Sequence, residues 1–150
     1  MFYRIIVIDA GHGGKDSGAT GNGYIEKNMT LKIVQNIKTN FDSDPLYKVY
    51  YTRLSDWYPT LTERYDLANT VSADRFLSVH INSADSASAK GTETLYKDYK
   101  TYANVIHSSS LSGMGYTKGL LMTEALYTSW TCSTSRNKND ECPCRDGIHL

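Results

Sequence analysis

The sequence predicts a single α/β domain built on a mixed, mostly parallel central sheet with helices on both faces. Two observations predict this fold class. First, β-rich runs at residues 5–8, 47–53 and 75–81 alternate with segments of helical periodicity at residues 28–41 and 61–71. Second, a chain of 150 residues is long enough to bury a sizeable core without disulfide or metal support.

Charge is balanced and scattered along the chain. Sixteen lysine and arginine residues match sixteen aspartate and glutamate residues, which argues against nucleic acid or an anionic membrane as a partner and favours a neutral or mixed ligand. No apolar run reaches the length of a membrane span, and residues 5–8 lack the features of a signal peptide. We therefore expect a protein that is cytoplasmic as synthesised. Three cysteines indicate neither a disulfide framework nor a complete zinc knuckle: Cys132, Cys142 and Cys144.

The first strand leads into a polar, glycine-rich turn. Residues 5–8 read Ile-Ile-Val-Ile and are followed by Asp9 and His12, which is how a buried strand delivers polar groups to its own end. Strand ends are where α/β folds place their chemistry. Three glycines leave room for a large group, such as a metal ion, near the ring of His12: Gly11, Gly13 and Gly14.

A helix follows the loop at residues 16–23. Glu26 stands just before this helix, either in its first turn or in the loop that enters it. From about residue 28 the apolar residues have helical spacing and define one face: Met29, Ile33, Val34, Ile37 and Phe41. Residues 42–45 end the helix, and the β-rich run at residues 47–53 completes a β-loop-α-β unit.

The second helix starts with a capping box, because Thr60 is followed three residues later by Glu63. Its apolar stripe has four members: Leu61, Tyr65, Ala68 and Val71. The strand at residues 75–81 then ends in His80, just as the first strand leads to His12. Because the carboxyl ends of parallel strands gather at one edge of a sheet, we expect the two histidines to meet there.

The C-terminal third carries weaker signals. Residues 91–96 are expected to form a further strand, the signal fades beyond Tyr102, and residues 120–127 are apolar but short. From residue 131 onward neither helical nor strand periodicity is present. We therefore expect a domain at residues 1–130 and an irregular tail at residues 131–150.

Three residues form a candidate metal site: His12, Glu26 and His80. Two imidazoles and one carboxylate are a ligand set of catalytic zinc, which keeps its fourth position for water. Zinc lowers the pKa of that water to roughly 7 and polarises an amide carbonyl, while a nearby carboxylate moves the proton. The spacing alone also fits structural histidines at strand ends and a glutamate that stabilises a helix start.

Five motifs follow one another between Ile5 and Tyr96: IIVIDAGHGGKDSGATG, Glu26 ahead of a helix, LTERYDLAN, FLSVHINSA and KGTETLY. This series resembles the zinc-dependent N-acetylmuramoyl-L-alanine amidases of the amidase 3 family. The resemblance implies a six-stranded central sheet, with zinc held by His12, Glu26 and His80. It also implies cleavage of the amide that joins the lactyl group of N-acetylmuramic acid to L-alanine of the stem peptide.

The resemblance extends to residues around the ligands and then stops. Asp9 and Asn82 match positions that flank the family's ligands and are expected to support them or to face the substrate, and Arg64 matches an arginine with a structural role. The family carries its general base, a glutamate, on a late strand of the type Pro-Ala-Val-Leu-Val-Glu, which is not recognisable here. Glu124 is the first candidate for this base and Glu141 the second. A truncated or out-of-frame C-terminal third would explain the departure.

Three functions are compatible with these motifs. The preferred one is a peptidoglycan amidase with Zn²⁺ as cofactor and a muramyl peptide as substrate. A catalytically inactive wall-binding or regulatory remnant would keep the metal and the groove but lack the base, and a zinc exopeptidase would act on ordinary peptides. The expected location is the cytoplasm until release to the cell wall, as for a bacteriophage endolysin, which we prefer, or a mother-cell enzyme.

Overall fold

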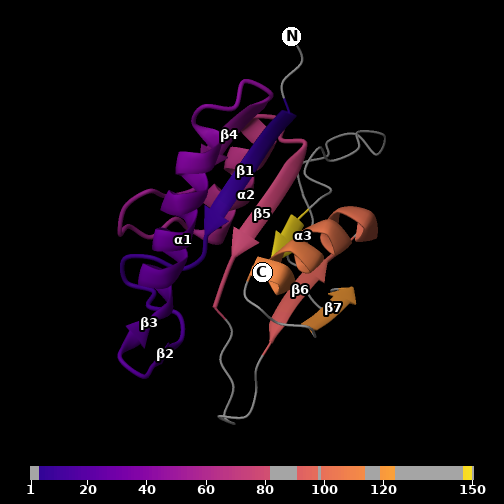
Figure 1. The fold of residues 1–150 in the computed structure, drawn as a ribbon. Coiled ribbons are helices and arrows are strands. Elements are labelled where there is room, and N and C mark those ends of the chain that lie inside the picture. The colour runs from indigo at the N-terminus through magenta and orange to yellow at the C-terminus, as the bar shows by residue number, and fades with distance from the viewer. Residues whose placement is uncertain (1–3, 82–90, 98, 114–118, 124–146, 150) are drawn as a thin grey trace.

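The computed structural model describes residues 4–81, 91–97, 99–113, 119–123 and 147–149. Its central element is a six-stranded sheet (Figure 1). The strands stand in the order β4 (Tyr47–Tyr51), β1 (Arg4–Ala10), β5 (Arg75–Val79), β8 (Gly147–His149), β6 (Thr92–Tyr96) and β7 (Gly119–Thr123). Neighbouring strands are parallel except β8 and β6, which are antiparallel. The expected mixed, mostly parallel sheet is therefore confirmed.

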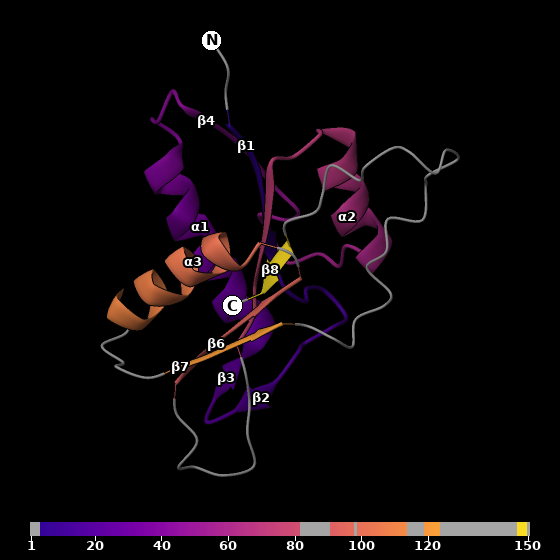
Figure 2. The same cartoon turned by 90° about the vertical axis from the view of Figure 1, so that its right-hand side faces the viewer.

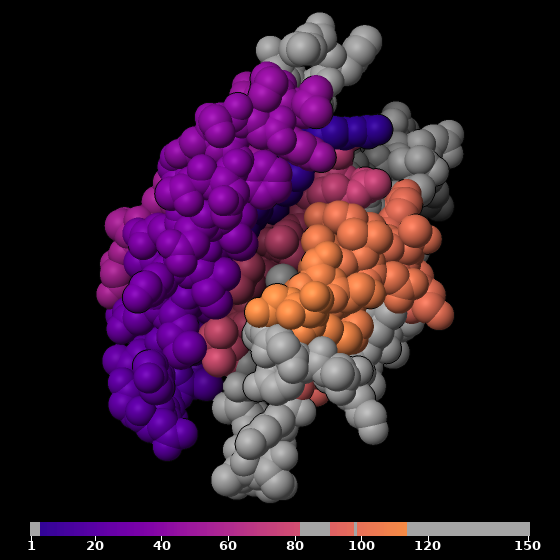
Figure 3. All heavy atoms as spheres, viewed as in Figure 1, coloured from indigo at the N-terminus to yellow at the C-terminus, as the bar shows by residue number. Residues whose placement is uncertain are grey.

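Helices cover both faces of this sheet, with α1 and α3 on one face and α2 on the other (Figure 2). Their bounds are α1 (Glu26–Phe41), α2 (Leu61–Thr70) and α3 (Lys100–Gly113). Side chains alternate along β1, so Ile6 and Ile8 pack with Val34 of α1. Val7, between them, packs with Ala68 of α2. On their shared face α1 and α3 stand apart, and atoms of the sheet are visible between them (Figure 3).

The starts of the first two helices agree with the sequence. A short hairpin of β2 (Thr20–Gly21) and β3 (Tyr24–Ile25) leads into α1, and Glu26 is the first residue of that helix. At the start of α2 the capping box is present, because Thr60 Oγ1 accepts from the Glu63 N–H over 3.2 Å and Glu63 Oε2 accepts from the Thr60 N–H over 2.7 Å.

The carboxyl ends of β1 and β5 lie side by side. The two strands are parallel neighbours, and Ala10 stands opposite Val79. Beyond the strands, the N–H of Gly11 still donates to the carbonyl of Val79 over 3.0 Å. His12 and His80 follow directly, so the expectation that both histidines reach one edge of the sheet is confirmed.

Three features differ from the expectations. Helix α3 occupies a segment whose sequence signal was weak, because serines in its C-terminal half obscure a stripe that buries Ala103 and His107. Strand β8 lies in the expected irregular tail, since its three residues gain their structure from pairing with β5 and β6 rather than from local periodicity. Leu61 and Ile33 were placed on apolar faces, but they are 57% and 36% exposed.

Some predicted residues lie outside the described part of the chain: Asn82, Glu124, Glu141, Cys132, Cys142 and Cys144. The domain boundary at residue 130 stays a prediction. Among the described helices, none has the length and apolar character needed to cross a lipid bilayer.

Candidate metal centre

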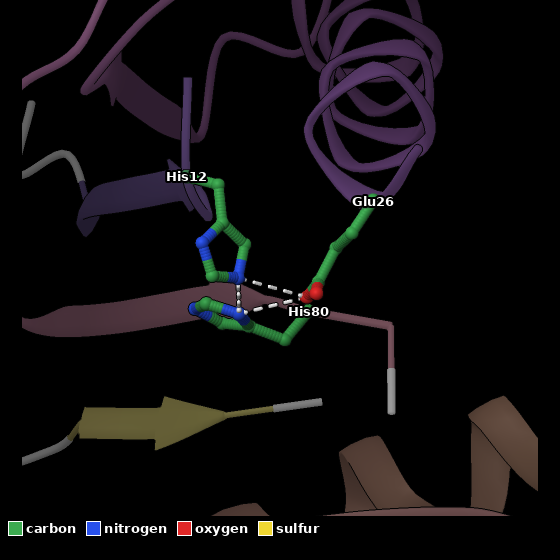
Figure 4. A group of neighbouring side chains, drawn as sticks. All are labelled: His12, Glu26 and His80. Atoms are coloured by element: carbon green, nitrogen blue, oxygen red, sulfur yellow. Dashed lines mark hydrogen bonds and ion pairs between the residues drawn. The ribbon is translucent and has the colours of Figure 1, made fainter. Parts of the chain in front are cut away.

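The side chains of His12, Glu26 and His80 converge at the carboxyl edge of the sheet (Figure 4). His12 Nε2 lies 3.1 Å from His80 Nδ1 and 3.1 Å from Glu26 Oε1, and His80 Nδ1 lies 3.0 Å from Glu26 Oε1. The three atoms thus form a nearly equilateral triangle. Each comes from a different element: the loop after β1, the first residue of α1, and the residue after β5. Together they are a donor set that fits a metal ion.

Glu26 is buried and held in the ionised state. Its Oε2 accepts from the Ala19 N–H and its Oε1 from the Ile81 N–H, both over 2.8 Å. Burial by itself raises the pKa of this carboxyl, but the hydrogen bonds from His80, Ala19 and Ile81, together with the charge of His12, lower it to about 2. The glutamate is therefore a permanent anion, as a metal ligand must be.

Asp16 fixes the ring of His12 through Nδ1, the nitrogen that does not face the other two ligands. Nδ1 lies 2.9 Å from Asp16 Oδ2, and Asp16 Oδ1 accepts from the Gly18 N–H over 3.1 Å. Partial burial raises the pKa of Asp16, but these two hydrogen bonds outweigh it and leave the pKa below its usual value. Asp16 was not among the predicted site residues. A carboxylate four residues after a candidate ligand is nevertheless a recognisable signal, because ligating histidines commonly donate to carboxylates.

Glycines permit the close packing of the two histidines, but at other places than predicted. A Cβ on Gly11 would lie 2.4 Å from Cε1 of His80, not against His12. A Cβ on Gly13 would lie 2.1 Å from the backbone oxygen of Trp57. The glycine that faces His12 is Gly18, where a Cβ would lie 2.5 Å from Cδ2 of the ring. The expectation for the turn is therefore corrected to Gly11 and Gly18.

Within the described part of the chain, Asp9 makes no contact with the three candidate ligands. It anchors Arg64 instead. The carboxylate is 1% exposed and accepts from Arg64 Nη1 over 2.6 Å, from Thr52 Oγ1 over 2.6 Å and from Ser78 Oγ over 2.5 Å. Arg64 Nη2 in turn donates to the backbone oxygen of His12 over 2.9 Å. These contacts support the structural role that the resemblance implies for Arg64.

A second buried arginine, which was not among the predicted site residues, holds the same turn. Arg53 is 2% exposed; its Nε donates to the carbonyl of Ala10 over 2.9 Å and its Nη2 to that of Gly11 over 2.7 Å. Arg64 donates to the carbonyl of His12, so the carbonyls of three successive residues, Ala10, Gly11 and His12, each accept from a buried guanidinium. The signal that could have found Arg53 is its place two residues after β4, a strand that pairs in parallel with β1.

A pocket of about 80 Å³ opens beside the ligands. Its lining includes the two histidines, Arg64 and the side chains of Tyr58 and Leu61. The side chains of the two histidines remain 22% and 33% exposed. A ligand can therefore approach the triangle of donor atoms from this side.

The fold and the site define an α/β protein with a His-Glu-His centre at the carboxyl edge of its sheet. Residues 6–134 match the family Amidase_3, described as N-acetylmuramoyl-L-alanine amidase. The chain belongs to this family.

Two curated relatives and one solved structure illustrate the match. The chain is 46% identical over 101 residues to the endolysin of Bacillus phage SPP1, covering 67% of this chain and 36% of that protein. It is 41% identical over 99 residues to the N-acetylmuramoyl-L-alanine amidase LytC of Bacillus subtilis, covering 66% and 20%. The catalytic domain of CwlV, an amidase of Paenibacillus polymyxa, superposes with a TM-score of 0.80 at 30% identity, covering 98% and 78%. The chain thus spans well under half of these two curated relatives.

Proposed function

We propose that this chain is a zinc-dependent amidase that cleaves the bond between N-acetylmuramic acid and L-alanine of peptidoglycan. The observation that carries the proposal is the triangle of donor atoms from His12, Glu26 and His80, with sides of 3.1, 3.1 and 3.0 Å. Membership of the amidase family supports the choice of substrate.

The donor set fits zinc in composition and in spacing. Two imidazole nitrogens and a carboxylate oxygen, with a fourth position left open, are typical of catalytic zinc. Tetrahedral ligands at the usual zinc distances of about 2.0–2.1 Å lie roughly 3.3 Å from one another. The three donor atoms are slightly closer than this, so small side-chain movements suffice to seat the ion.

Zinc bound there would supply Lewis-acid chemistry, making a water molecule more acidic and polarising the amide carbonyl. The residues of the chain supply the rest. Glu26 contributes a fixed negative charge, and His12 keeps its Nδ1 hydrogen bond to Asp16 while Nε2 faces the other ligands. The pocket beside His12 and His80 offers the entry for the scissile amide.

Hydrolysis also needs a base that takes a proton from water and passes it to the leaving amine. Among the described residues, Asp9 and Asp16 are the carboxylates that line the pocket. Asp9 is bound to Arg64, and Asp16 to the His12 ring. We therefore place the base beyond the described residues, with Glu124 as the first candidate and Glu141 as the second.

The test is hydrolysis of a defined muramyl peptide by the purified chain, with zinc measured in the same sample. We expect about one zinc ion per chain, release of a peptide with N-terminal L-alanine, and loss of both metal and product in His80→Ala. Glu124→Gln should retain zinc but lose activity, whereas Glu141→Gln should keep both. Bound zinc without hydrolysis would instead support an inactive wall-binding module, and cleavage of ordinary peptides alone would support an exopeptidase.

We further propose a lytic role at the bacterial cell wall, as for an endolysin. The identity of 46% to the endolysin of a Bacillus phage supports this role. Purified chain added to isolated Bacillus cell walls is expected to lower their turbidity, and chelation of zinc to prevent this. Walls that stay turbid while the muramyl peptide is cleaved would separate a lytic role from the amidase reaction.

A further inference from the structure

We infer that Asp16 is a positioning residue of the metal centre, whose carboxylate selects the tautomer and the orientation in which His12 offers Nε2 to the metal. This inference rests on the proposed function. Asp16 lies within the first of the motifs that carry the resemblance, but the resemblance gives it no role at the site.

The contact with Asp16 determines which nitrogen of the His12 ring carries the proton. An ionised carboxylate only accepts hydrogen bonds, so the nitrogen that faces it, Nδ1 of His12 at 2.9 Å from Asp16 Oδ2, must carry the proton. In the neutral ring, which is the form that can bind a metal, Nδ1 then carries the single N–H and Nε2 keeps its lone pair. This Nε2 is the atom that lies 3.1 Å from Glu26 Oε1 and from His80 Nδ1.

The carboxylate of Asp16 is itself held in a fixed position. The backbone of Asp16 forms a closed bridge with Gly13, with N–H to carbonyl bonds of 2.9 Å in both directions. Its other carboxylate oxygen, Oδ1, accepts from the Gly18 N–H over 3.1 Å. Both oxygens thus accept from fixed donors, one in the ring and one in the backbone. A carboxylate held in this way can orient the imidazole ring that donates to it.

Because both carboxylate oxygens of Asp16 accept hydrogen bonds, the substitution Asp16→Asn tests its role directly. Asparagine has one oxygen and one NH₂ group where Asp16 has two oxygens. If its oxygen faces His12, its NH₂ group meets the N–H of Gly18. If its oxygen faces Gly18, its NH₂ group donates to Nδ1 of the ring, which selects the tautomer with the proton on Nε2. That tautomer has no lone pair for a metal at Nε2.

A second aspartate offers a matched control. Asp56 ties the same loop, because its Oδ1 accepts from the Gly14 N–H over 2.8 Å and its Oδ2 from Lys27 Nζ over 2.7 Å. Its hydrogen bonds within the described part of the chain go to Gly14 and Lys27 and not to the ring of His12. Asp56→Asn therefore loosens the loop without changing what Nδ1 faces, and it separates positioning of the ring from general stabilisation of the loop.

The experiment measures zinc affinity by competition with a chromophoric chelator for the unmodified chain, Asp16→Asn, Asp16→Ala and Asp56→Asn. We expect both Asp16 variants to bind zinc about 10–100-fold more weakly and Asp56→Asn to stay within about threefold. In parallel, ¹⁵N chemical shifts of the His12 ring in the metal-free proteins, measured at a pH at which the ring is neutral, report the tautomer. We expect the Nδ1–H form in the unmodified chain and in Asp56→Asn, and a shift toward Nε2–H in Asp16→Asn.

Unchanged zinc affinity and an unchanged tautomer in Asp16→Asn would overturn the inference, as would an equal loss of affinity in Asp56→Asn. Circular dichroism establishes that each variant is folded. An unmodified chain that binds no zinc would overturn the proposed function instead. In that case the ¹⁵N shifts still decide whether Asp16 sets the tautomer of His12.

Discussion

His12 reaches the metal centre from a backbone conformation that side chains rarely adopt. Its φ is +61°, in the left-handed region, where a residue with a Cβ is strained by about 1–3 kcal/mol. The hydrogen bonds on the backbone carbonyls of Ala10, Gly11 and His12 offset this strain. At the residue scale, the site therefore depends on a strained turn that hydrogen bonds from Arg53 and Arg64 hold in place.

Gly18→Ala should damage both the turn and the ligands. With φ at +63°, its Cβ would lie 2.5 Å from His12 Cδ2 and 2.7 Å from Glu26 Oε2. We expect about a tenfold or greater loss of zinc affinity and a fall of about 1–3 kcal/mol in the free energy of unfolding, measured by chelator competition and urea denaturation. Gly23→Ala is the control, because its φ is +80° but nothing lies within 4 Å of the added Cβ. It should lose stability and keep its zinc affinity; equal affinity losses in the two variants would contradict the contact argument.

Arg53→Lys should destabilise the chain more than the same change at the surface. A lysine cannot replace the fork of donors that reaches Ala10 and Gly11, so the carbonyl of Ala10 keeps only its bond from Arg64 Nη1 and that of Gly11 only its bond from Thr30 Oγ1. We expect a loss of about 1–3 kcal/mol in urea denaturation. Arg4→Lys, at an exposed arginine 3.7 Å from Asp74, should change stability by less than about 0.5 kcal/mol. Similar losses in the two variants would count against the role of Arg53.

At the scale of elements, the site depends on strand order and helix starts. The parallel pairing of β1 with β5 sets the two histidines side by side, and α1 begins at its own ligand, Glu26. The start of α2 determines where Arg64, one turn later, meets the carbonyl of His12. Local sequence predicts these starts well, because apolar periodicity and the capping box are local signals.

Thr60→Ala should weaken the start of α2. The variant loses the acceptor for the Glu63 N–H and with it half of the capping box, which typically costs about 1 kcal/mol. Thr70→Ala, at the exposed last residue of the same helix, should change stability by less than about 0.5 kcal/mol. Thermal or urea denaturation of the two variants compares them directly. A Thr60→Ala variant as stable as the original chain would show that the box adds nothing to the helix.

At the scale of the whole molecule, zinc binding and folding should be linked. The ligands are distant in sequence and meet only in the folded chain, so zinc at 100 times its dissociation constant should add about 2.7 kcal/mol of stability. For a domain of this size that corresponds to a rise of about 5–10 °C in Tm. Calorimetry of the unmodified chain with and without zinc measures the shift. His80→Ala should show no shift, and neither should the unmodified chain with Mg²⁺, which prefers oxygen ligands.

The sequence predicted the mostly parallel sheet, the strand ends that carry His12 and His80, and Glu26 at a helix start. It did not predict Asp16 or Arg53 in their places, because their partners are ring and backbone atoms whose positions arise only from the folded turn. Helix α3 and strand β8 were missed for a related reason. The stripe of α3 is diluted by serine, and β8 exists through its pairing with distant strands.

The position of β8 has a consequence for the order of events during synthesis. This strand stands between β5 and β6 in the sheet but comes from residues 147–149. The ribosome therefore releases β1, α1 and β5, with all three donor side chains, long before the sheet can become continuous. The portion that holds His12, Glu26 and His80 has time to assemble first, and the second portion, β6 and β7, joins it only once β8 has emerged.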